Sequence, residues 1–178
     1  MMIKLYKSEG NTLHYWEAWD KDNEITVHWG VVGDEGTMRE ISLSPGDDAS
    51  SIIKAEAAPR RAEGYREIED DKLQRVVIQY TIVEMGTTAD LDKRYEVEGL
   101  MNERLGWTGL GHCDGGDIGS GTMNIFCFVV DPDKALQVIA EELKTKHLLE
   151  GAKIILASED EDKVLFPVDH PNVGKQGN

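Results

Sequence analysis

The stretch His28-Trp29-Gly30-Val31-Val32-Gly33-Asp34-Glu35-Gly36 decides how the first half of this chain is expected to fold. It closes a strand-like run that begins at Glu24, and a second run, 37–43, follows it directly. Glycine adopts the backbone conformations that a tight turn between strands requires, and Gly33 and Gly36 flank such a turn. The stretch therefore predicts a turn within an antiparallel sheet.

Two more strands are expected before this stretch. Residues 3–6 alternate in polarity, and residues 13–19 are rich in aromatic side chains, which pleated surfaces favour. The polar cluster 20–23 separates the second of these runs from Glu24 and predicts a turn. The first half thus reads as four short strands in sequence order.

A helix is expected after this sheet. Asp48 or Ser50 can cap an alanine-rich run, which Pro59 is expected to kink or interrupt because proline lacks a backbone N–H. The charged stretch 67–72 has no apolar face and is interpreted as a linker. The first domain is therefore assigned to residues 1–70.

The second domain is assigned to residues 74–170. Its expected elements are a strand over 76–83, a helix from Asp90 with an apolar stripe at Leu91, Tyr95, Met101 and Leu105, a strand over 122–130, a helix capped by Asp131-Pro132, and strands over 153–157 and 164–166. With a further strand before 122, this order is β-α-β-β-α-β, which predicts a ferredoxin-like sandwich. The predicted fold class is α+β, and the tail 171–178 is expected to fray.

The strand over 122–130 is apolar on both faces, with Phe126 and Phe128 on the second face. A two-layer sandwich covers only one face of its sheet. We therefore expect the strand to be central and deeply buried, or its second face to pack on the first domain or on another subunit.

The glycine-rich segment 106–121 allows two interpretations. A phosphate-binding loop needs a helix directly after the glycines, whereas here a strand follows and Asp114 and Asp117 add negative charge. A bulged β-hairpin is the favoured interpretation. If the hairpin centres on Ser120, Cys113 lies opposite Cys127 as a reduced thiol pair. His112 and Cys113 would then point to opposite faces, so they should not share a metal ion.

The first domain resembles a WGR domain over roughly residues 1–70. The matching features are the Trp29-Gly30 pair, the glycines at 33 and 36, a returning strand with Arg39 and Ile41, a helix, and Gly64-Tyr65. In poly(ADP-ribose) polymerases this domain helps to read a broken DNA end, and the motif's tryptophan and arginine contact the nucleic acid. Val31 stands at the arginine position here, and valine cannot pair with a phosphate.

Charge and composition narrow the classes of partner. The net charge is −15, and both halves of the chain are acidic, which argues against non-specific binding to nucleic acid. No apolar run approaches the length of a membrane span, no signal peptide is evident, and the two cysteines form no disulfide framework, so a cytoplasmic protein is expected.

The predicted function is that of a non-enzymatic binding or adaptor protein. It would engage a protein partner through the WGR-like or hairpin surface, and the predicted partner-binding residues are Trp29, Gly30, Arg39 and Tyr65. The alternative is a module for DNA ends that uses Trp29 as a stacking platform. A third hypothesis is an enzyme with its site around Asp114 and Asp117. No catalytic residue, cofactor or metal ligand is predicted.

Overall fold

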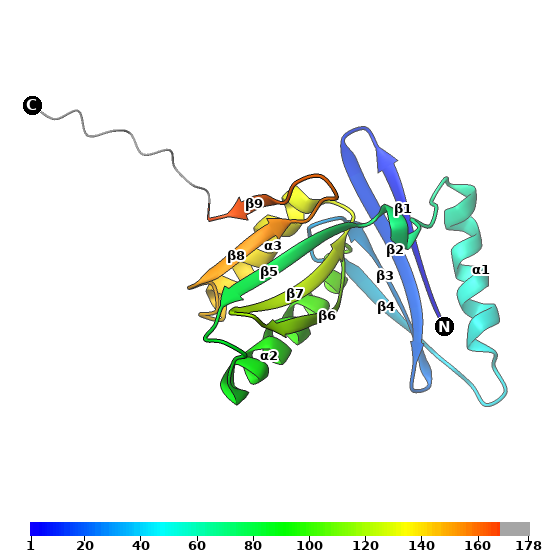
Figure 1. The fold of residues 1–178 in the computed structure, drawn as a ribbon. Coiled ribbons are helices and arrows are strands. Elements are labelled where there is room, and N and C mark those ends of the chain that lie inside the picture. The colour runs from blue at the N-terminus through cyan, green and yellow to red at the C-terminus, as the bar shows by residue number, and fades with distance from the viewer. Residues whose placement is uncertain (168–178) are drawn as a thin grey trace, which may run out of the picture.

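A computed structural model describes residues 1–167 of the chain as two antiparallel sheets with three α-helices, which confirms the α+β class (Figure 1). The last residues of the predicted second domain and the tail 171–178 lie outside the described residues. No helix among the described residues is long and apolar enough to cross a membrane.

The first sheet is a four-stranded meander in which each strand pairs with the next along the chain. Its strands are β1 (Met2–Glu9), β2 (Thr12–Lys21), β3 (Glu24–Val31) and β4 (Thr37–Ser42). Helix α1 (Ala49–Ala62) covers one face of this sheet, on the side away from the rest of the molecule (Figure 1). The expected antiparallel sheet with one helix is therefore confirmed.

The face of the first sheet under α1 is built from alternate residues of the strands, as a period of two dictates. Its apolar side chains pack against Ile53 and Ala57 of the helix, and they are Ile3, Leu5, Trp16, Ala18, Ile25 and Val27. Asp48 caps α1, because its carboxylate accepts a hydrogen bond from the backbone N–H of Ser50. We call this surface the helix face of the first sheet.

Of the kink or interruption expected at Pro59, the interruption is wrong, since α1 continues to Ala62. Pro59 lies in the last turn, so it removes only one hydrogen bond near an end that is already incompletely bonded. Its own carbonyl accepts a bond from the N–H of Glu63 at 2.9 Å, which continues the helical pattern beyond it.

The second sheet has the strand order β6-β7-β5-β8-β9. Its elements are β5 (Gln74–Thr81), α2 (Thr88–Trp107), β6 (Gly111–Gly119), β7 (Thr122–Val129), α3 (Pro132–Thr145), β8 (Ala152–Leu156) and β9 (Lys163–Phe166). Strands β5, β6, β7 and β8 form the split βαβ arrangement of a ferredoxin-like sandwich. Strand β9 is added at the edge of the sheet beside β8. Both helices lie on the same face of the sheet (Figure 1).

Helix α3 begins at its expected cap, whereas α2 begins at Thr88, two residues before the expected start at Asp90. Thr87 and Asp90 form a reciprocal capping box at the start of α2, and Asp131 caps α3 before Pro132. The apolar stripe expected on α2 is only half right. Leu91 and Tyr95 are exposed, because the first turns of α2 extend beyond the sheet that the later turns cover.

The hairpin interpretation of the glycine-rich segment is confirmed. Strands β6 and β7 pair across a turn at Ser120 and Gly121, with a register shift between Cys113 and Gly116. Cys113 lies directly opposite Cys127, as expected, and the two Sγ atoms are 2.7 Å apart. The hydrogen bond with Cys113 and burial raise the pKa of the Cys127 thiol above its ordinary value.

Strand β7 is interior to the sheet, and its second face is only partly covered. Phe126 and Phe128 are half-buried on the face away from the helices. The ring of Phe128 stacks on His112, and the Arg75 guanidinium lies 5.9 Å from the ring centre of Phe126. Neighbouring side chains of the same sheet supply part of this cover.

The stretch 67–72 connects the two units but is not free of apolar contacts, contrary to expectation. Ile68 packs against the core of the second unit, and Arg66 forms an isolated bridge with Tyr6 of β1. The first unit also contributes the side chains of Tyr6, Tyr15 and Val32 to that core. The connection is therefore anchored at both sides.

Candidate functional site

The second face of the first sheet carries a row of polar side chains that the sequence did not lead us to expect. The register places Lys4 opposite Glu17 and Glu17 opposite His28, on three neighbouring strands. Side chains directly opposite one another in antiparallel strands are close enough to interact. We call this surface, which is turned toward the second unit, the docking face.

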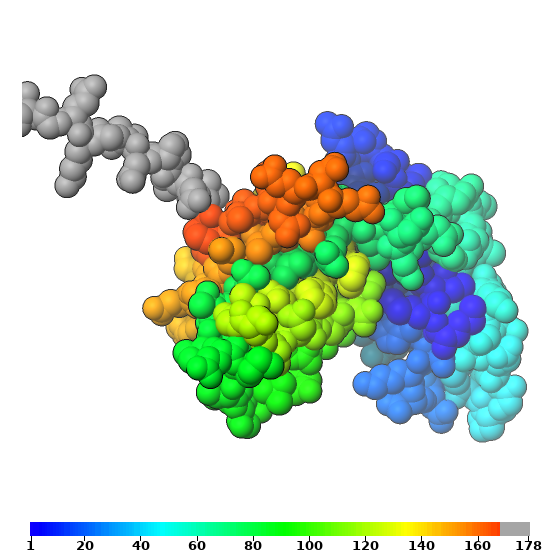
Figure 2. Space-filling view, viewed as in Figure 1, coloured from blue at the N-terminus to red at the C-terminus, as the bar shows by residue number. Residues whose placement is uncertain are grey.

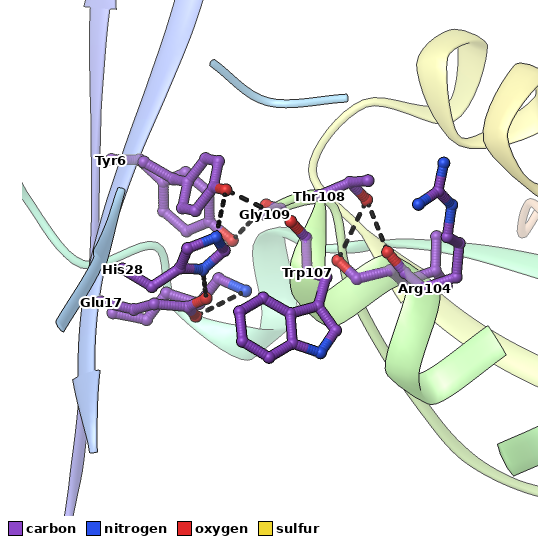
Figure 3. A network of polar contacts seen from close by, with 10 residues as sticks. Tyr6, Glu17, His28, Arg104, Trp107, Thr108 and Gly109 are labelled. Carbon is purple, nitrogen blue, oxygen red and sulfur yellow. Dashed lines mark hydrogen bonds and ion pairs between the residues drawn. The ribbon is translucent and has the colours of Figure 1, made fainter. Parts of the chain in front are cut away.

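Glu17 and His28 of this row form a buried hydrogen-bonded chain with Tyr15 of β2; Figure 3 shows Glu17 and His28 in this network. His28 Nδ1 lies 2.8 Å from Glu17 Oε1, and His28 Nε2 lies 3.0 Å from the Tyr15 hydroxyl. Glu17, His28 and Tyr15 are only 3%, 1% and 0% exposed. A buried carboxylate needs such partners, because an unpaired charge in a protein interior is costly.

The second unit completes the chain through the segment that joins α2 to β6. The Tyr15 hydroxyl lies 3.3 Å from the carbonyl oxygen of Trp107, and the Tyr6 hydroxyl donates to the carbonyl of Gly109 at 3.0 Å. The Trp107 ring packs edge-on against His28, with ring centres 4.8 Å apart (Figure 3). The two units therefore meet at a polar network rather than at an apolar patch alone.

Three positions around this network are glycine because neighbouring atoms lie too close to the backbone for a Cβ. A Cβ on Gly36 would lie 2.3 Å from the Tyr15 hydroxyl, and one on Gly109 would lie 2.3 Å from the Tyr15 ring. A Cβ on Gly30 would lie 2.9 Å from the Cα of Gly36. Gly30 and Gly36 thus make room for Tyr15 and His28.

Burial raises the pKa of both phenols well above the ordinary value, and the Glu17 carboxylate adds to the rise at Tyr6 and Tyr15. Both hydroxyls therefore keep their protons and remain hydrogen-bond donors. Tyr15 has no contact with solvent, so no substrate can reach its oxygen. The hydrogen-bonded chain of Glu17, His28 and Tyr15 resembles a catalytic relay in its residue types. It ends, however, at a buried hydroxyl.

A cleft of about 810 Å³ opens beside this network, between the first sheet, the connection and the end of α2. Figure 2 shows the two units adjoining there, with the dark-blue strand β1 beside the yellow-green β6–β7 hairpin. Aromatic side chains from both units line it, namely Tyr6, Trp19 and Trp107. The carboxylates that line it are Glu17, Glu67, Glu69, Asp70 and Glu103, whereas Lys4 is the lysine among the described lining residues.

The predicted partner-binding residues do not form one site. Trp29, Arg39 and Tyr65 lie on the helix face, where Trp29 and Tyr65 are half-buried against the core under α1. Arg39 pairs with Glu56 of α1 at one edge of the sheet, whereas Tyr65 lies near Lys7 of β1 at the other. Gly30 lies opposite Tyr15 on the docking face.

The hairpin carboxylates are also apart from the cleft. Asp114 and Asp117 are both exposed, and Asp117 accepts a hydrogen bond from the side chain of Asn124 at 2.7 Å. The residues that sequence reasoning missed are Tyr15, Glu17, His28 and Trp107. A signal for Glu17 and His28 was present, because a two-residue turn at Asp22-Asn23 places them opposite each other.

No protein-family model matches this chain, and neither the curated proteins nor the solved structures include a detectable match.

Proposed function

We propose that this chain is a non-enzymatic binding protein, and that it holds a segment of a protein partner in the cleft between its two units. The observation that carries the proposal is the aromatic wall, to which the first sheet contributes Tyr6 and Trp19 and the second unit Trp107. Tryptophan and tyrosine dominate the energetics of protein interfaces because each buries a large area at little entropic cost.

The exposure of Trp107 supports binding rather than core packing. Trp107 is 36% exposed although it contacts His28 and Trp19, so part of its ring is open to a ligand. The closed position of Tyr15 favours a structural role for the hydrogen-bonded chain, in which it fixes the angle between the units. We place the protein in the cytoplasm, where its two thiols would stay reduced.

Peptide selection tests this proposal. Peptides selected from a random display library on the full chain should bind at least tenfold more weakly to Trp107→Ala, because a central aromatic ring carries much of the binding free energy. Tyr95→Ala is the matched control, since Tyr95 is an exposed aromatic residue of the same helix outside the cleft. Equal binding to both variants, or loss of binding on Arg39→Ala alone, contradicts the proposal.

A further inference from the structure

We propose that Cys113 and Cys127 form a redox site, at which a hydroperoxide converts the two thiols into a disulfide within one chain. These are the two cysteines of the sequence, and both are free thiols in the structure. They lie on β6 and β7, and neither is among the described residues that line the cleft. The site is therefore separate from the one proposed for a protein partner. In a reducing compartment its resting state is the dithiol.

The hairpin places the two sulfur atoms within reach of each other. Cys113 lies directly opposite Cys127 in the register, so both side chains project from the same face of the sheet. Residues in such positions have Cα atoms about 4.5–5.5 Å apart, inside the range of about 4.4–6.8 Å that disulfides span. The Sγ atoms are already 2.7 Å apart, so the strands need no rearrangement before the two sulfurs can be joined.

The surroundings of Cys113 fix its position and still permit a small adjustment. Its backbone N–H donates to Oδ1 of Asn102 on α2 at 3.2 Å. Strand β6 is at the edge of its sheet, and its register shifts between Cys113 and Gly116. An edge strand with a bulge can rotate locally without disturbing a second neighbouring strand. Closing the disulfide therefore affects one strand pair only.

The two thiols differ in exposure, and this difference assigns their roles. Cys113 is partly exposed, whereas Cys127 is 0% exposed and belongs to the core of the second unit. A peroxide therefore reaches Cys113 first. The raised pKa of Cys127, caused by its hydrogen bond with Cys113 and by burial, also disfavours it as the first nucleophile, because the thiolate is the attacking form. Cys113 is the attacking residue and Cys127 the resolving one.

The reaction balances in two steps. The Cys113 sulfur attacks one peroxide oxygen, the O–O bond breaks, and the departing oxygen takes the thiol proton and leaves as water or an alcohol. The Cys127 sulfur then bonds to the sulfur of the resulting sulfenic acid, the S–O bond breaks, and the hydroxide leaves as water with the Cys127 proton. The two thiols together supply the two electrons that reduce the peroxide.

A dithiol reverses the change by thiol–disulfide exchange. Its thiolate attacks the partly exposed Cys113 sulfur, and the Cys127 sulfur leaves and takes up a proton. The second thiol of the reductant then attacks the mixed disulfide and releases Cys113, so the reductant ends as its own disulfide. The site therefore returns to the dithiol state without loss of either cysteine.

Oxidation of the full chain with a small molar excess of hydrogen peroxide tests the inference. Free thiols should fall from two to none, and the mass of the intact chain should fall by that of two hydrogen atoms. The chain should remain a monomer on a non-reducing gel, and mass mapping of its fragments should join Cys113 to Cys127. Dithiothreitol should restore both thiols.

Single variants test the assigned roles. Cys127→Ala should stop at the sulfenic acid of Cys113, which dimedone traps, because the resolving thiol is absent. Cys113→Ala should lose its remaining thiol about tenfold more slowly than the parent loses its first, since Cys127 is buried. Asp117→Asn, at an exposed position of the same hairpin, is the control and should form the disulfide as the parent does. Circular dichroism checks that each variant is folded.

The parent carries the test if a variant does not fold, because dimedone added during the reaction should label Cys113 and not Cys127. Equal labelling of both cysteines would overturn the assigned roles. Two persisting thiols would overturn the inference itself. Oxidation of Cys113 to a sulfinic acid beside a free Cys127 would do so too, and so would a disulfide between two chains, because Cys113 would then act as an isolated thiol.

Discussion

The two faces of the first sheet use the same strands in opposite ways. The helix face packs apolar side chains of β1, β2 and β3 against Ile53 and Ala57 of α1. The docking face carries Lys4, Glu17 and His28 in one row and is covered by the end of α2. The helix face is apolar throughout, whereas the docking face adds this polar row to the buried rings of Tyr6 and Tyr15.

The difference shows how each face obtains its specificity. Apolar contacts on the helix face are non-directional, so they tolerate small shifts of α1. Hydrogen bonds on the docking face have fixed lengths and angles, so they hold the second unit in one position relative to the sheet. The position of Trp107, and with it the shape of the cleft, depends on the polar face.

The largest expected effect is on the docking face. His28→Leu leaves the Glu17 carboxylate without its hydrogen-bond donor, and a buried charge that loses its partner costs about 3–5 kcal/mol. Urea unfolding of the variant measures this loss of free energy of unfolding.

A double variant distinguishes an unpaired charge from lost packing. Glu17→Leu combined with His28→Leu should recover most of the stability, because apolar replacements for both partners leave no buried charge. If the single variant costs less than about 1 kcal/mol, water from the cleft must solvate Glu17, and the comparison of the two faces fails.

A smaller loss is expected on the helix face. Ile53 is fully buried, and Ile53→Ala should cost about 3 kcal/mol through lost burial and the cavity it leaves. The binding of cleft peptides should be unchanged at temperatures where the variant is folded. Weaker peptide binding by folded Ile53→Ala would show that the two faces are coupled through the sheet.

The smallest effect concerns the start of α1. A hydrogen bond from the Ser51 hydroxyl, together with backbone N–H groups, holds the pKa of Asp48 below its ordinary value of 3.8. A lowered carboxyl pKa stabilises the fold above the ordinary value, and this contribution is lost as the pH falls through the lower folded value.

Asp48→Ala should therefore lower Tm by roughly 2–4 °C near neutral pH, and the two proteins should converge in acid. Thermal melts across the acidic range check this. A difference in Tm that persists unchanged in strong acid would assign the effect to helix propensity rather than to the cap.

The strands and caps could be predicted because their signals are local. Period-two alternation and turn residues located every strand of the first sheet, and Asp48 and Asp131 were recognisable caps. The prediction that Cys113 lies opposite Cys127 was correct because two deviations from the expected hairpin cancel each other. The turn centres half a residue beyond Ser120, and the bulge before Gly116 shifts the register back.

The docking face could not be predicted because its burial is a tertiary property. Alternation identifies Glu17 and His28 as the polar side of their strands, which would normally face water. Only the approach of Trp107, which is far along the chain, buries them. The motif around Trp29 led to predicted site residues on the helix face instead. Gly30 and Gly36 of this motif nevertheless make room for Tyr15 on the docking face.

The polar row on the docking face also has a consequence while the chain is being synthesised. All strands of the first sheet are synthesised before α2. The docking face is therefore exposed to water until Trp107 has been synthesised and packs on it. An apolar face in that interval would invite association between nascent chains. Lys4, Glu17 and His28 are polar side chains, so this row keeps part of the uncovered face polar until Trp107 packs on it.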